Sequence, residues 1–146
     1  MSNSIVVCRI SARSRNGWPI SLSFATAAKA AIAAFAAVAK DESIGKPFRD
    51  LALIRQTTME FDTLPPDQVI ARMKPLAAKG SPWAGSAGEL IAVAQLKAGN
   101  PTQAGATFAA LATDPGVPAS IRSRAAQMAS VLGVDTNPAA LPSLSR

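Results

Sequence analysis

The sequence repeats itself at an offset of 73 residues, and this repeat restricts the fold more than any other feature. Residues 35–39, Phe-Ala-Ala-Val-Ala, align with residues 108–112, Phe-Ala-Ala-Leu-Ala. The alignment continues without a gap through the next loop, where it pairs Asp41 with Asp114, Ile44 with Val117, Phe48 with Ile121, Arg49 with Arg122 and Ala52 with Ala125. A shared preference for helix would not preserve a loop, so the two regions are copies of one structural unit.

Half of this offset matches the length of a two-helix repeat. It is about 36 residues, close to the roughly 34 residues of a tetratricopeptide hairpin. A helical segment with Met73, Leu76 and Ala77 falls at the intermediate position. The repeating unit is therefore a helical hairpin.

Proline, glycine and aspartate divide residues 25–133 into six predicted helices, without an alternating strand pattern. We expect the first helix at about 25–40. The next four should begin at Pro47, at Pro65 and Pro66, at Ser81 and Pro82, and at Asn100 and Pro101. The fourth should end at about Ala98, and the sixth should run from after Gly116 up to Gly133. The predicted fold class is all-α, with antiparallel helical hairpins stacked as a short TPR-like α-solenoid. Residues 134–146 have no period and are expected to form a flexible tail.

Apolar spacing predicts the buried face of each helix. The second helix should turn Leu51, Ile54, Thr58 and Phe61 towards neighbouring helices. Pro75 should kink the third helix or end it early, because proline lacks the backbone donor. The inward positions of the other helices are Val69, Ile70, Met73, Leu76, Ala77, Ala104, Phe108, Leu111, Ala112, Ile121, Ala125, Met128 and Leu132.

The residue types argue against an enzyme. Histidine and tyrosine are absent and Cys8 is the single cysteine, which excludes Ser/His/Asp and Cys/His catalysis, zinc sites and intramolecular disulfides. The carboxylates of residues 41–67 are scattered around predicted helix ends. We expect no catalytic residue, metal, cofactor or small-molecule substrate. No apolar stretch reaches the ~20 residues that span a bilayer, so the chain as written is expected to be soluble.

Residues 1–24 look foreign to the rest. The net charge is +6, and half of it comes from this segment, where Arg9, Arg13 and Arg15 stand without an acid. We consider a disordered basic arm, a weak secretory signal, or an incorrectly translated start that replaces a helix of the repeat. We favour the third, because the repeat requires a partner helix there.

The most complete single unit spans residues 85–118. It resembles a tetratricopeptide repeat in the spacing of Gly88, Ala92, Gly99, Ala104 and Phe108. Small residues let paired helices approach, and Phe108 fills the gap to the next hairpin. Phe35 lies in an earlier unit that lacks its first helix, so the helix at 25–40 has an uncovered flank. This flank predicts self-association or marginal stability.

Three segments resemble a known family. They are residues 47–56 (Pro-Phe-Arg-Asp-Leu-Ala-Leu-Ile-Arg-Gln), residues 81–90 (Ser-Pro-Trp-Ala-Gly-Ser-Ala-Gly-Glu-Leu) and residues 97–108. They are similar to the tetratricopeptide-like domain of the bacterial ancillary SecYEG translocon subunit (YfgM-like) family, over about residues 27–135. Members have one N-terminal membrane anchor and a periplasmic repeat domain that contacts the translocon and periplasmic chaperones. The resemblance implies an accessory scaffold at the inner membrane, although this chain lacks the anchor and the opening repeat helices.

We therefore expect a domain at 25–133 that binds other proteins and performs no chemistry. The repeat register places Ser86, Glu89, Val93 and Lys97 on the concave side, with Arg55 as a further candidate; for each, an ordinary solvated face is the alternative. We interpret Trp83 as packing within its own domain. The alternative function is an adaptor that binds nucleic acid or anionic lipid through the basic arm; nucleic acid is disfavoured because the arm has few aromatic side chains.

Overall fold

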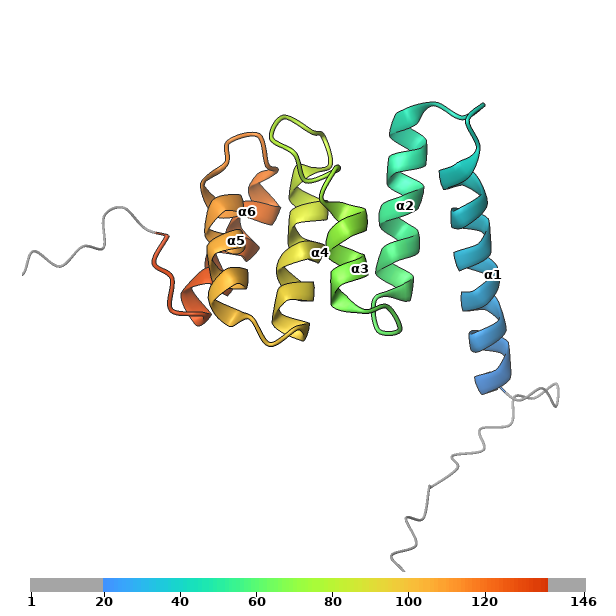
Figure 1. The fold of residues 1–146 in the computed structure, drawn as a ribbon, viewed down its shortest axis with the longest axis horizontal. Helices are drawn as coiled ribbons and strands as arrows, with labels where there is room; N and C mark the ends of the chain where they lie inside the picture. The colour runs from blue at the N-terminus through green and yellow to red at the C-terminus, as the bar shows by residue number, and fades with distance from the viewer. Residues whose placement is uncertain (1–19, 137–146) are drawn as a thin grey trace, which may run out of the picture.

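The computed structural model describes the backbone of residues 20–136 and the side chains of residues 25–136. This part of the chain contains no strand and six α-helices: α1 (Ile20–Lys40), α2 (Lys46–Glu60), α3 (Pro66–Met73), α4 (Ala84–Lys97), α5 (Pro101–Thr113) and α6 (Ala119–Val131). The all-α prediction is confirmed. Helices α1 to α5 follow one another in a row with α6 behind α5, and successive helices alternate in direction, so α2, α4 and α6 run the same way (Figure 1).

Two predicted helix starts are wrong. Helix α1 begins at Ile20 rather than at residue 25, and α4 begins at Ala84 rather than at Ser81. The Ser81 hydroxyl accepts a hydrogen bond from the Trp83 N–H at 3.2 Å, and the Ser81 carbonyl accepts one from the Ala84 N–H at 3.1 Å. These bonds close a turn before the helix, so Ser81 caps the turn and not α4 itself.

The predicted helix ends are confirmed. Helix α3 ends at Met73, two residues before Pro75, and turns follow it. Gly99 and Gly133 adopt positive φ angles of 78° and 79° just after α4 and α6. This left-handed conformation closes a helix at little cost only in glycine.

The sequence repeat reappears as repeated loop geometry. Asp41 and Asp114 each accept a hydrogen bond on Oδ1 from the N–H two residues ahead, at 2.9 and 2.8 Å. The backbone carbonyls of the same two residues accept bonds from the Ile44 and Val117 N–H groups, both at 3.1 Å. The α1–α2 and α5–α6 connections are therefore the same Asx turn, 73 residues apart.

The core consists of two clusters that meet at α4. One cluster joins α2, α3 and α4, and its buried residues are Ile54, Val69, Met73, Leu76, Ala87 and Ala94. The other joins α4, α5 and α6, and its buried residues are Ala92, Phe108, Leu111, Val117, Ala125 and Ala129. Each helix thus packs on its neighbours along the row, and the predicted inward faces of α3, α5 and α6 contribute to these clusters.

Helix α2 is turned differently from the prediction. Its buried residues are Ala52, Ile54 and Thr57, whereas Thr58 is exposed and Leu51 is half-buried. Thr57 tolerates full burial because its hydroxyl donates to the Leu53 carbonyl at 2.8 Å. The predicted stripe on α2 therefore reaches the core at Ile54 and, half-buried, at Phe61, which packs against the first core cluster.

Small residues allow close helix contacts around α4. A Cβ atom added to Gly88 would lie 2.7 Å from Leu111 Cδ2 on α5, and one added to Gly85 would lie 2.9 Å from Ile121 Cδ1 on α6. Both glycines are buried. Helix α4 can approach both neighbours this closely only without side chains at these two positions.

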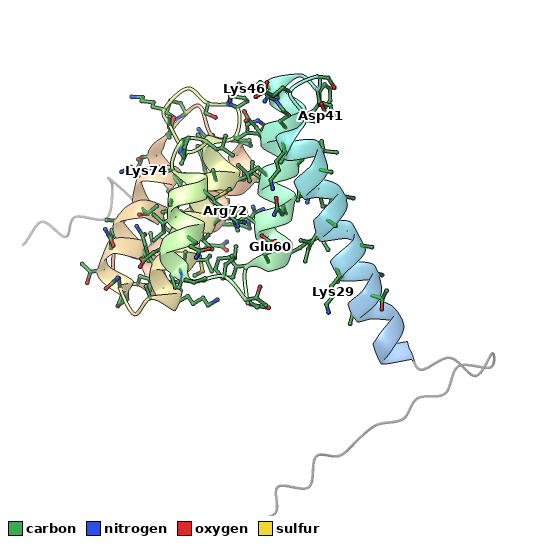
Figure 2. The ribbon with its side chains drawn as sticks, turned by 45° about the vertical axis from the view of Figure 1, so that its right-hand side comes forward. Lys29, Asp41, Lys46, Glu60, Arg72 and Lys74 are labelled. Atoms are coloured by element: carbon green, nitrogen blue, oxygen red, sulfur yellow. The ribbon has the colours of Figure 1, made fainter. Side chains whose placement is uncertain are left out.

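A charged pair connects α2 to α3. Glu60 Oε2 accepts a hydrogen bond from Arg72 Nη1 at 2.6 Å, and Gln56 donates to the same carboxylate (Figure 2). Burial by itself raises the pKa of Glu60, but the bonds from Arg72 and Gln56 outweigh it and hold the pKa below its ordinary value. The carboxylate therefore stays ionised at neutral pH and keeps the bond.

The predicted tail is ordered at its start. Val134 packs on the second core cluster, over Gly105 of α5, and its N–H donates to the Ala129 carbonyl at 2.8 Å. Val134 therefore belongs to the packed domain, contrary to the boundary predicted at 133. The rest of the predicted tail after Thr136 lies outside the described residues, as do residues 1–19.

Helix α1 packs mainly on α2. Residues 25–30 are all exposed, and neither core cluster includes a residue of α1. No helix in the described part of the chain combines the length and apolarity that crossing a bilayer would require.

Phe35, expected beside an uncovered flank of α1, is half-buried, and self-association stays a prediction. The average mass measured by light scattering should rise with protein concentration, because a terminal repeat helix without a polar outer face is usually covered. A constant monomer mass together with a sharp, cooperative melt would contradict this expectation.

Candidate functional site

An open groove of about 670 Å³ crosses one face of the domain. Its walls come mainly from the three helices that run in the same direction, α2, α4 and α6, and Phe108 of α5 also lines it. Much of the lining is apolar: Leu51, Ile54, Phe61, Trp83, Leu90, Val93, Phe108 and Met128. Val93 is 39% exposed.

The lining residues recur in the three helices with the same spacing. Each helix contributes two residues four positions apart: Leu51 and Arg55, Glu89 and Val93, Arg124 and Met128. Residues four apart lie on one face of a helix. The first and last of these pairs are related by the 73-residue offset of the sequence repeat. The α2 and α6 sides of the groove are therefore lined at equivalent positions of the sequence repeat.

Four of the five predicted partner-binding residues line this groove: Arg55, Ser86, Glu89 and Val93. Their role in binding stays a prediction. Lys97 is not among the lining residues; it is exposed, and its ammonium group binds backbone carbonyls at the end of α2. Lys97 Nζ donates to the carbonyls of Phe61, Asp62 and Leu64 at 2.7, 3.0 and 3.1 Å and lies 5.3 Å from the centre of the Phe61 ring. It ties α4 to the end of α2, where a cation is favoured.

Glu89 is held by an ion pair across the groove. Its two carboxylate oxygens accept hydrogen bonds from Arg124 Nε at 3.1 Å and from Arg124 Nη2 at 2.8 Å. The hydrogen bonds to Glu89 raise the pKa of the Arg124 guanidinium, so the arginine stays charged. Glu89 and Arg124 thus largely neutralise each other, and α4 is joined to α6 at the groove surface.

Trp83 packs against the first core cluster and also lines the groove. Its indole nitrogen is buried without a hydrogen-bond partner. The packing agrees with the prediction that Trp83 packs within its own domain. The indole N–H without an acceptor is a local cost to stability.

Sequence reasoning missed the other lining residues: Leu51, Ile54, Thr58, Phe61, Asp62, Trp83, Leu90, Phe108, Arg124 and Met128. The repeat contained a usable signal for Arg124 and Met128, because they follow Leu51 and Arg55 by one full offset. Thr58 and Phe61 carried no such signal, since an apolar stripe along a helix looks the same whether it faces the core or an open groove.

The described residues contain no group of three or more His, Cys, Asp or Glu side chains placed to hold a metal ion. Comparison with models of protein families finds no match to this chain. Comparisons with curated proteins and with solved structures find none either. The geometry of the groove is therefore the basis for inferring a function.

Proposed function

We propose that this protein is a non-enzymatic interaction module, a short TPR-like α-solenoid whose groove binds a segment of another protein. The observation that carries the proposal is the open, largely apolar groove of about 670 Å³ lined by residues of α2, α4 and α6. Stacked hairpins present such extended concave surfaces, and apolar grooves with a few polar groups are typical binding sites. The repeated Asx turn and the glycine contacts around α4 support the solenoid.

The resemblance to the ancillary SecYEG translocon subunit family suggests which partners to test. In this proposal the module is an accessory scaffold at the bacterial inner membrane, with its repeat domain facing the periplasm. Its partners are translocon subunits or periplasmic chaperones. The alternative adaptor function depends on Arg9, Arg13 and Arg15, which lie outside the described residues, and no observation on the described part of the chain favours it.

The substitution Val93→Glu tests the groove. It places a charge on the apolar surface, which an apolar partner segment would have to desolvate. Binding to purified SecYEG in detergent, measured by biolayer interferometry, should weaken about tenfold or more, which corresponds to about 1.4 kcal/mol. Val131→Glu is the matched control, because Val131 is 80% exposed on α6 and outside the groove lining.

Both variants should keep the circular dichroism spectrum of the unmodified protein. Equal loss of binding in the two variants, or none in either, would refute the assignment of the groove as the binding site for this partner. Replacing SecYEG by purified periplasmic chaperones in the same assay tests the other partner class.

A further inference from the structure

The α2 wall of the groove carries two opposite charges without partners. Arg55 and Asp62 both line the groove, seven residues apart. Neither side chain forms an ion pair or a hydrogen bond with any described residue, although the backbone carbonyl of Asp62 accepts a bond from Lys97. Asp62 lies in the turn two residues after the end of α2, where the Leu64 N–H donates to the Glu60 carbonyl at 2.9 Å and so continues the helical rise; seven residues therefore correspond to roughly 10 Å along the wall.

The other walls offer no comparable free charge. Glu89 on α4 and Arg124 on α6 are already paired with each other. Leu90 and Val93 give the α4 wall an apolar surface over the same length. An occupant of the groove therefore meets unpaired charge on one side and mainly apolar side chains on the other.

We infer that the groove takes an amphipathic helix of the partner. This helix carries an acidic residue opposite Arg55 and a basic residue, seven positions away, opposite Asp62. Apolar residues between these two contact Leu90 and Val93. This inference rests on the proposed function, whose partner segment it specifies. A helix lying along α2 rises by the same amount per residue, so its own residues seven apart meet both charges. An extended chain covers roughly 10 Å in about three residues and points them alternately to opposite sides, which leaves too few apolar side chains for the α4 wall.

Designed helical peptides test this arrangement by fluorescence anisotropy. All share one apolar stripe and differ at positions i and i+7, which hold Glu and Lys, Lys and Lys, Glu and Glu, or two Gln residues. The full chain should bind the Glu/Lys peptide roughly fivefold more tightly than the Gln/Gln peptide, a modest factor because surface ion pairs are weak. The preference should shrink at high salt. A peptide of the same composition with Lys moved to i+5, away from the face that carries Glu, should lose the preference over the Gln/Gln peptide.

Charge reversals in the protein should redirect this preference. Arg55→Glu leaves two acidic side chains on the wall and should prefer the Lys/Lys peptide, whereas Asp62→Arg leaves two basic ones and should prefer the Glu/Glu peptide. Arg122→Glu on α6 is the control, because Arg122 does not line the groove, and it should keep the Glu/Lys preference.

The outcomes separate this inference from the proposed function. Equal binding of all peptides, abolished by Val93→Glu, would overturn the charge arrangement and support an apolar binding groove. Binding of no peptide would also overturn the inference, while SecYEG binding that is sensitive to Val93→Glu would still support the proposed function. A rise to dimer mass in light scattering that Arg55→Glu abolishes would identify a second copy of this chain as the occupant, and would overturn the inference as well.

Discussion

Replacing Phe108 by alanine should lower the free energy of unfolding by about 3–5 kcal/mol, the usual cost of deleting a buried phenylalanine ring. Phe108 is 2% exposed and packs in the cluster that joins α4, α5 and α6. Its neighbours there include Ala92, Ala125 and Ala129, whose short side chains cannot fill the cavity left by the ring. Because a small domain has only about 5–15 kcal/mol of stability in total, the variant should lose a large part of it.

Urea denaturation followed by circular dichroism measures this loss, with the midpoint falling and the slope unchanged. Phe48→Ala is the matched control, because Phe48 is 67% exposed and its removal should change the free energy of unfolding by less than about 0.5 kcal/mol. A loss below 1 kcal/mol for Phe108→Ala would mean that this ring does not join the hairpins.

The parts of the fold that were predicted correctly depend on local chemistry. The sequence repeat predicted that the loops at Asp41 and Asp114 are equivalent, and both contain the same Asx turn, which needs only a carboxylate and a backbone N–H two residues ahead. The ends of α3 and α4 follow from Pro75 and Gly99, whose backbone preferences are strong. Such features can be predicted from a single sequence because no distant residue is required.

The errors in the predicted fold concern how helices are oriented and where they begin. The stripe predicted to be buried on α2 includes Leu51, which is half-buried, and Thr58, which is exposed, and both line the groove. Apolar spacing shows that a face is apolar, but it does not show whether another helix covers that face. The start of α1 at Ile20 was missed because residues 1–24 were interpreted as a segment foreign to the repeat.

The candidate site was predicted in outline, and its electrostatics were not. The repeat register brought Ser86, Glu89 and Val93 to one face of α4, and all three line the groove. The partner of Glu89 is Arg124, which is 35 residues away along the chain. The carbonyls that bind Lys97 are 33–36 residues away. Contacts of this range depend on how the hairpins stack, which residue spacing within one helix does not determine.

Replacing Gly88 by valine should destabilise the protein by about 1–3 kcal/mol, because α4 and α5 are too close for a side chain at this position. Even a Cβ atom would lie 2.7 Å from Leu111 Cδ2 and 3.1 Å from Leu111 Cδ1. Leu111 is 8% exposed, so it has little room to move away. The higher helix propensity of valine, worth roughly 0.5 kcal/mol relative to glycine, offsets only part of this cost.

A double-mutant cycle with Leu111→Ala distinguishes this contact from a general effect on α4. Leu111→Ala alone should cost about 2–5 kcal/mol, since it leaves a cavity. In the double variant the valine occupies part of that cavity. The free energy of unfolding lost in the double variant should therefore be about 1–3 kcal/mol smaller than the sum of the two single losses. Strictly additive losses in urea denaturation would show that Gly88 does not approach Leu111. The close packing of α4 on α5, on which both the hairpin stack and the shape of the groove depend, would then have to be abandoned.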